Sequence, residues 1–579
     1  MNTLRRIPFA TARAFALATA LTLFFDSPVT PALAAASASA SAPIPFAGKL
    51  DEFAGVQALV TVRHPKLILA ELDKLMAEVP EAAMLRMVLP QLTPYGYPEF
   101  TEFVAGSNIG VVVLDVDPET LAARPPTIVA LARMKESGKI RTMLTPAGLS
   151  FKKQGEWTVI SQGAADLTAI QSSLPAIIAA IERPQTEEIK LWVRATPKLL
   201  TGLKTPAWTA LQPKFATRPA DEQNAIHAYF DIAWKYLEQL HSLGGSIDLN
   251  DQGIALSYHG QFLPESALGT LLRHPPGASP RIAQSVPADG LLNGAMRLNN
   301  PPFLDFFDAL LDELLAVDYA AGREALAPAR KSFRAVLAQS DGGAGLTVDV
   351  AMPRANQPPE MALFAAYSGT FSEEQLFAYY RDSIALSQKA SEGMLAAISA
   401  ATPGAPVPKM EMKFTENVFT IDGVRFGSMA SKTTIPAAGA EQVSAMTQYF
   451  GVANGTMVLA TSEDALRARL PAILAGRPVV NPVPSTFQNG QVLIMAVRGE
   501  KVVDLLVSQA APNLADEDVR AQIETIKEAF ASAAPPTITL EATDARAGVT
   551  YSIPYKFIAQ CARLATVFTA PKTPPAPRP

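Results

Sequence analysis

Four arginines at the ends of predicted strands form a repeated pattern that could bind a ligand. Arg63, Arg194, Arg297 and Arg498 each end an apolar segment and precede a turn and a helical segment. Guanidinium groups hold carboxylates and phosphates through paired hydrogen bonds, so two of these residues could clamp an anion. A structural role at the rim of a sheet explains the recurrence more simply, because a ligand site usually survives in only one copy. We keep the four as ligand candidates and favour the structural interpretation.

A polar stripe on a predicted long helix is the candidate metal site. Asp231, Glu238 and His241 lie on it, and Glu238-x-x-His241 has the spacing of one half of a carboxylate-bridged di-metal site. Such a site needs a second half, and the sequence has none. The neighbouring apolar stripe from Ile226 to Leu240 predicts the core face of the same helix. We therefore expect a solvated or salt-bridged margin here, with these three residues as a weak metal candidate and no cofactor.

Two candidate nucleophiles fit structural roles better than catalytic ones. Ser150 and Lys153 have the Ser-x-x-Lys spacing of some acyl-transfer enzymes, but they fall in a predicted strand, where positions three apart point to opposite faces. Cys561 is the single cysteine, and it shares a predicted helical face with Phe557 and Leu564, which predicts a buried and unreactive thiol. A lone cysteine also excludes an intramolecular disulfide, so apolar burial must stabilise the fold.

The N-terminus predicts export. Basic residues between Arg5 and Arg13 precede an apolar run from Phe15 to Phe25, and small residues at Ala32 to Ala34 fit a cleavage site. Cleavage near Ala34 makes residues 1–34 a signal peptide and places the mature chain in the periplasm or outside the cell, by Sec or twin-arginine export. The apolar run is too short to span a bilayer, and we expect no transmembrane segment in the mature chain.

The charge of the chain excludes one class of partner. Its 49 Lys and Arg and 54 Asp and Glu give a net charge of -5, and both signs are spread along the sequence. Nucleic-acid binding calls for concentrated basic residues, so we expect no nucleic-acid partner. The partner is therefore expected to be an unknown protein or a small molecule.

Two long stretches of the chain repeat each other. The strand that ends at Arg63 returns at Arg297, an offset of 234 (297 − 63), and the apolar segment 158–167 returns at 457–466, an offset of 299 (457 − 158). The 4-3-4 helical faces that follow the two strands keep an offset of 235: Ile68, Leu72, Leu75 and Val79, then Phe303, Phe307, Leu310 and Leu314. A constant offset with a single jump predicts two homologous copies, the second with an insertion of roughly 65 residues.

This repetition sets the predicted domains. A linker rich in Ala, Ser and Pro covers residues 35–48, the first lobe 49–276 and the second lobe 284–570, and a disordered Pro-rich tail covers 571–579. The insertion covers about 374–453, with strands at 410–414 and 418–422, then a turn and loop at 424–427.

Strands, helices and hairpins in this order predict an α+β fold: two tandem homologous lobes, each a mostly antiparallel sheet covered by helices. No acid, base and nucleophile converge in the sequence, so an enzyme is the less favoured class. We expect an exported, non-catalytic binding or structural protein of unknown ligand. The alternatives are a periplasmic carrier of a lipid or apolar ligand, because the helices are apolar, and a secreted hydrolase with dispersed catalytic residues.

Overall fold

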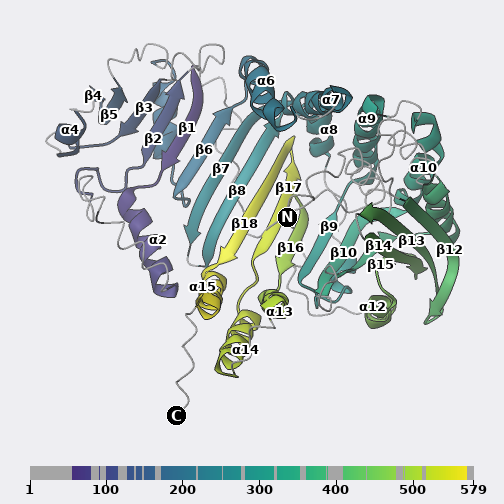
Figure 1. Ribbon diagram of the computed structural model, residues 1–579. Helices are drawn as coiled ribbons and strands as arrows, with labels where there is room; N and C mark the ends of the chain where they lie inside the picture. Colours follow the sequence, from purple (N-terminus) through teal and green to yellow (C-terminus); the bar gives the residue numbers. More distant parts are fainter. Residues whose placement is uncertain are drawn as a thin grey trace. The chain divides into compact units, whose positions relative to one another are not determined.

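The computed structural model is a mixed α and β structure with extensive antiparallel pairing (Figure 1). The residues that it describes are 55–79, 90, 100–114, 127–135, 139–145, 149–162, 171–216, 220–250, 252–274, 281–318, 322–351, 360–385, 388, 409–437, 440–476, 487, 490–510 and 517–569. The predicted signal peptide, linker and tail lie outside these residues. The described residues fall into two compact units: unit 1 holds those of 211–233 and 270–496, and unit 2 holds those of 36–210, 234–269 and 497–579.

Unit 2 contains an antiparallel sheet. Its described strands lie in the order β4-β5-β3-β2-β1-β6-β7-β8-β18-β17. Their bounds are β1 Val56–Val62, β2 Ile109–Leu114, β3 Ile128–Ala132, β4 Leu149–Gln154, β5 Trp157–Gln162, β6 Ile189–Arg194, β7 Leu240–Asn250, β8 Gly253–Phe262, β17 Thr537–Thr543 and β18 Arg546–Pro554. The pairing of β8 with β18 joins segments almost 300 residues apart in the chain.

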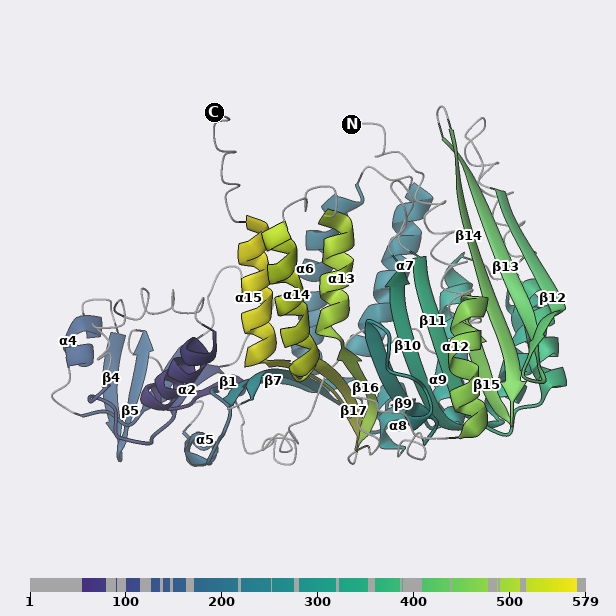
Figure 2. The ribbon, with the colours of Figure 1, turned by 90° about the horizontal axis from the view of Figure 1, so that it is seen from below.

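Helices cover parts of this sheet. They are α2 Pro65–Glu78, α4 Lys139–Leu144, α5 Leu174–Glu182, α6 Pro197–Leu211, α13 Gly499–Ala510, α14 Glu517–Ser532 and α15 Tyr555–Thr569. Figure 2 shows α5 on one side of the sheet and α13, α14 and α15 standing on the other. Ile177 and Ile181 of α5 pack on Val112, Val129 and Trp192 in the main core of the unit. The chain passes between the units within α7 Ala220–Leu237 and α8 Ala267–Arg273.

Unit 1 contains strands in the order β12-β13-β14-β15-β11-β10-β9-β16. Their bounds are β9 Leu292–Arg297, β10 Ser340–Ala351, β11 Glu360–Gly369, β12 Lys409–Ile421, β13 Val424–Ala437, β14 Ala440–Ala453, β15 Thr456–Ala460 and β16 Gln491–Val497. Its helices are α9 Asn300–Asp318, α10 Gly322–Leu337, residues 373–385 and α12 Glu463–Ala475, with a short 3-10 turn at Arg281–Gln284. Residues of β9, β10, β11 and β15 are buried on both faces.

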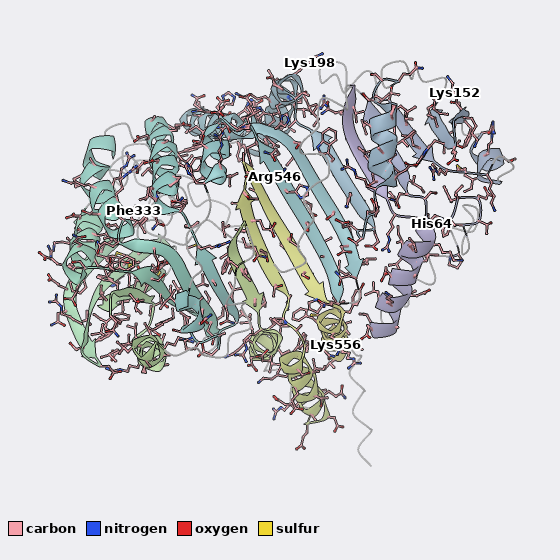
Figure 3. All side chains as sticks on the ribbon, turned by 180° about the vertical axis from the view of Figure 1, so that it is seen from behind. His64, Lys152, Lys198, Phe333, Arg546 and Lys556 are labelled. Carbon is pink, nitrogen blue, oxygen red and sulfur yellow. The ribbon has the colours of Figure 1, made fainter. Side chains whose placement is uncertain are left out.

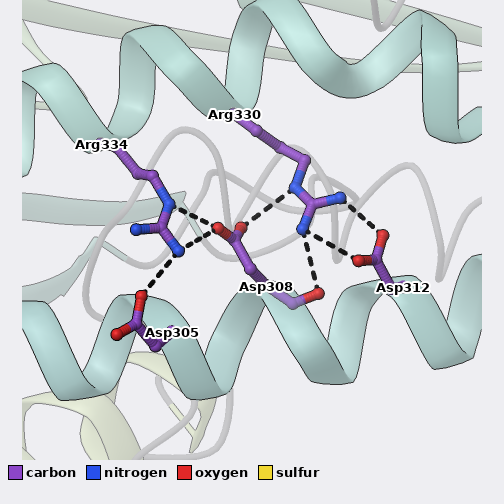
Figure 4. A network of polar contacts seen from close by, with 5 residues as sticks. All are labelled: Asp305, Asp308, Asp312, Arg330 and Arg334. Carbon is purple, nitrogen blue, oxygen red and sulfur yellow. Dashed lines mark hydrogen bonds and ion pairs between the residues drawn. The ribbon is translucent and has the colours of Figure 1, made fainter.

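An ion-pair network fastens α9 to α10 (Figure 4). Arg330 donates to Asp308 at 3.0 Å and to Asp312 at 2.6 Å, and Arg334 donates to Asp308 at 2.5 Å and to Asp305 at 2.9 Å. The side chain of Asp308 is 16% exposed and takes a guanidinium on each oxygen. The network therefore fixes the register of the two helices and explains the acidic stripe of α9 without a ligand.

The two units share a pairing order and a register. β5-β3-β2-β1-β6 in unit 2 corresponds to β15-β11-β10-β9-β16 in unit 1. The pair Val129 and Ser161 corresponds to the pair Phe364 and Ala460, at offsets of 235 (364 − 129) and 299 (460 − 161). These are the offsets found in the sequence. The compact units nevertheless differ from the ranges 49–276 and 284–570, because β17 and β18 lie in the same unit as β8.

Two local predictions were wrong. The helix expected to carry both Asp231 and His241 ends at Leu237, and His241 lies on β7, because the chain from Leu240 pairs with β8 instead. The segment 424–427 begins β13 rather than forming a turn and loop, whereas the strands expected at 410–414 and 418–422 lie, except for Asp422, in one continuous strand, β12. In each case the hydrogen bonds of a neighbouring strand outweigh a local pattern.

Candidate functional site: an open apolar sheet face

Arg63 and Arg194 do not converge on a shared ligand. Arg63 directly follows β1 and donates to the Thr186 carbonyl at 3.1 Å and to the Glu188 carboxylate at 3.0 Å. Burial raises the pKa of Glu188, which is also an acceptor for the Leu249 amide. Arg194 lies six residues further along β6, so its backbone is about 20 Å from this pair. The two residues stand at opposite ends of neighbouring strands.

The other two arginines also have partners at their own strand ends. The Nε of Arg297, at the end of β9, donates to the Gln491 carbonyl at 2.6 Å, and its guanidinium lies 5.2 Å from the centre of the Phe487 ring. Burial lowers the pKa of Arg297. Arg498 forms an ion pair with Glu500 in the first turn of α13. These contacts support the structural interpretation of the arginines.

The weak metal candidate is not assembled as a helical site. Asp231 is on α7, Glu238 follows the last residue of that helix, and His241 is on β7. The carboxylate of Asp231 lies 3.9 Å from Nδ1 of His227, one turn earlier on the same helix. Among the residues placed by the structure, no group of three or more His, Cys, Asp or Glu side chains is positioned to hold a metal ion.

The candidate nucleophiles have ordinary surroundings. Ser150 is on β4, as expected, and its Oγ lies 2.9 Å from Oγ of Ser161 on β5. Cys561 of α15 is exposed, so the prediction of a buried thiol was wrong. Leu564, three positions on, is buried, which shows that the core face of α15 is turned slightly away from Cys561. Partial burial still raises the pKa of the thiol, which disfavours the thiolate.

The feature that sequence reasoning missed is a reversed alternation in the central strands of unit 2. Four large apolar side chains on one side of the sheet are exposed: Leu191 43%, Leu243 48%, Ile247 38% and Tyr258 56%. On β7, β8 and β18 the opposite side carries mostly small and polar residues, and several of those are buried, including Ser242, Ser257 and Thr550. β6 is the exception, because its Trp192 is buried in the core on that side. A half-buried antiparallel sheet normally shows the opposite arrangement, with apolar residues inward.

Strand register places these apolar residues on one continuous surface. Val111, Val60, Leu191, Gly245, Tyr258, Val549 and Leu540 follow one another across seven strands, from β2 to β17. The parallel row contains Ile247, Leu256 and Tyr551. We name this surface the open face and define it by Val60, Leu191, Val193, Leu243, Ile247, Leu256, Tyr258, Val549 and Tyr551.

The back face of the same strands is polar and closely packed. Ser257 and Thr550 share a hydrogen bond of 2.9 Å, and Arg546, labelled in Figure 3, donates from Nε to Gln261 at 2.6 Å. The ring of His259 lies over Gly244, where a Cβ would come within 2.1 Å of Nε2. Burial, with smaller contributions from two nearby positive charges, lowers the pKa of His259 to about 4. The neutral imidazole therefore belongs to the packing of this face.

The largest apolar patch on a typical monomeric protein covers about 300–600 Å² and often marks an interaction site. Each residue on one face of a strand occupies about 33 Å², so the nine residues of the open face cover about 300 Å² and their apolar neighbours extend the surface.

No helix of the described ranges is long and apolar enough to cross a membrane. No protein-family model matches the chain, and comparison with curated proteins and with solved structures likewise finds no significant match.

Proposed function

We propose that this chain is a non-catalytic binding protein and that the open face is its binding surface. The observation that carries the proposal is the exposure of Leu191, Leu243, Ile247 and Tyr258 on one face while polar residues of the same strands are buried. Burying an apolar side chain completely is worth about 1.5–3 kcal/mol, so covering these four half-exposed residues would contribute roughly 4 kcal/mol. That is enough to support specific binding once a partner is positioned.

The carrier of a lipid or other apolar ligand is the second candidate. Its support is the chemistry of the open face, which would accept an acyl chain. Small ligands, however, usually lie in concave sites that bury 70–90% or more of their surface. Side chains exposed by 38–56% on a sheet suit a large partner better. We therefore place a macromolecular partner first.

We further propose that the two lobes arose by tandem duplication. The support is the common strand order and the pairs that recur at offsets of 235 and 299 in the two units. In this proposal the insertion of the second lobe corresponds to the long strands β12, β13 and β14 and to the helical residues before them. Export through the N-terminal signal peptide, with cleavage near Ala34, is likewise a proposal that rests on the sequence alone.

Dye binding tests the open face directly. The fluorescence of anilinonaphthalene sulfonate rises on exposed apolar surface. Replacing Leu243 and Ile247 together by Thr, which suits strands, should remove most of the signal. The matched control replaces Leu67 and Leu506 by Gln; these residues are 40% and 38% exposed on helices α2 and α13. Equal signals from the two double variants would show that the face does not act as a site.

Photo-crosslinking tests binding in the cell. A photoreactive residue at Tyr258 should give a discrete adduct, whereas the same residue at Leu67 should not. The Leu243→Thr, Ile247→Thr background should abolish the adduct from position 258. An adduct pattern that is identical at the two positions would contradict the proposed function.

A further inference from the structure

The open face of unit 2 has a covered counterpart in unit 1. At the recurring offsets, Val111 corresponds to Leu346 and Ala130 corresponds to Ala365, and both residues of unit 1 are buried. One side of the sheet in unit 1 is covered by α12, whose Leu466 and Leu470 pack with Phe364. The other side, which corresponds to the open face, is covered as well.

Helices cover that side in unit 1. α9 lies against β10, and its Leu304, Phe307 and Leu311 are buried. Phe307 contacts Phe333 of α10 at 6.2 Å between ring centres. Further along the sheet, Tyr380 of the helical residues 373–385 stacks on the buried Phe450 of β14 at 3.6 Å. Unit 1 therefore closes this face with amphipathic helices from its own chain.

Unit 2 uses the corresponding helix elsewhere. α2 follows β1 as α9 follows β9, with the same 4-3-4 apolar spacing at an offset of 235. Leu75 of α2 and Val79, which directly follows the helix, pack on Tyr555 and Ala559 of α15, and α2 also contacts β7. α4, which stands at the offset of residues 374–379, has six residues and buries Ile140 beside Ile160 only at the edge. Among the residues that the structure describes, no helix packs on the centre of the face.

We infer that the open face binds an amphipathic helix of a partner protein, in the place that α9 takes in unit 1. The row from Val111 to Leu540 crosses seven strands, which is about 29 Å. A helix with the 19 residues of α9 is about 28 Å long. Gly245 lies in the middle of this row and contributes no side chain to the open face. The inference rests on the proposed function.

The helices of unit 2 argue against a flat occupant. Ile254, on the side of the open face, packs with Tyr555 and Ala559, so α15 stands on that side at the ends of β8 and β18. α14 packs beside α15 and is about 24 Å long, as its 16 residues require. A second sheet would have to come within about 10 Å of the open face, and a bilayer would have to lay a flat surface against it. The upright helices, seen in Figure 2, obstruct both.

A peptide with the sequence of residues 300–318 is the probe, because it is the helix that covers the corresponding face in unit 1. Fluorescence anisotropy of the labelled peptide should show saturable binding to the full-length mature protein. Binding should weaken at least about tenfold, or about 1.4 kcal/mol, in the Leu243→Thr, Ile247→Thr variant. The Leu67→Gln, Leu506→Gln variant should bind as the wild type does. A peptide with Leu304 and Phe307 replaced by Asp should not bind.

Other outcomes separate this inference from the proposed function. If the peptide does not bind but dye binding and crosslinking still depend on the open face, the proposal of a helical partner is wrong and the proposal of a binding surface is retained. Flotation with vesicles of phosphatidylcholine and phosphatidylglycerol that depends on Leu243 and Ile247 would identify a lipid occupant and overturn the helix. If dye binding, crosslinking and peptide binding are all unchanged by the substitution of Leu243 and Ile247, both proposals fail.

Discussion

Protonation of His259 should control the stability of unit 2 in mild acid. Its folded-state pKa is about 4, lowered by burial and by the charges of Arg546 and Lys190, whereas the unfolded chain should titrate near 6.5. Between these values the folded state binds fewer protons than the unfolded state, so stability rises with pH. The contribution of the neutral ring is complete above about pH 6.5 and is lost as the pH falls toward 4. A difference of 2.5 pKa units corresponds to about 3 kcal/mol, of which about 2.5 kcal/mol is gone by about pH 4.5.

Tryptophan fluorescence can follow this transition specifically. All four tryptophans of the chain, Trp157, Trp192, Trp208 and Trp234, lie in unit 2. Urea unfolding should be measured between about pH 7.5 and pH 4.5 for the wild type and for His259→Gln, which cannot titrate. The variant is expected to be less stable at neutral pH but to lose about 2.5 kcal/mol less on acidification. Subtracting the stability curve of the variant from that of the wild type removes the contributions of the other groups whose pKa is shifted, including His64.

Parallel stability curves for the two proteins would refute the reasoning. Parallel curves would mean that the protonated ring of His259 reaches solvent, so that burial in the back face does not oppose its charge. A normal titration of His259 near pH 6.5, followed by nuclear magnetic resonance of the ring protons, would lead to the same conclusion.

Three further results are expected. Asp308→Asn should destabilise unit 1 by about 1–3 kcal/mol, because Arg330 loses an ionised acceptor in the network of Figure 4, and urea unfolding of unit 1 followed by circular dichroism will measure it. Ile177→Ala, in the core, should cost about 2–5 kcal/mol, whereas Leu243→Ala, on the open face, should cost no more than about 1 kcal/mol; similar losses would mean that the face is covered. N-terminal sequencing of the exported protein should start near Ala35, and an intact Met1 would contradict export by cleavage.

Some local features follow from residues that are close together in the chain. Pro65 begins α2 because its missing N–H has no partner to lose in the first turn. The Asn250 to Gly253 turn joins β7 and β8, and Oδ1 of Asn250 accepts from the amides of Gln252 and Gly253. Both features depend only on residues close together in the chain, so composition and spacing are sufficient to find them.

Pairing between distant strands could not be predicted in the same way. Ser257 of β8 lies opposite Thr550 of β18, and neither sequence segment carries a signal for the other. This pairing places the last strands and helices of the chain in unit 2. His241 illustrates the same limit, since its helical spacing from Glu238 was visible while the competing strand partner, near Gln261, was far away.

The open face shows which physical term was missing from the sequence reasoning. Leu243, Ile247 and Tyr258 alternate with small or polar neighbours, which is the period of a half-buried strand. Alternation identifies two faces but does not say which is covered, because that depends on where helices from elsewhere in the chain pack. α2 has the apolar spacing to cover this side, yet its Leu75 packs on α15. The direction of burial is therefore a tertiary property, and the exposed apolar side that results is the surface a partner would use.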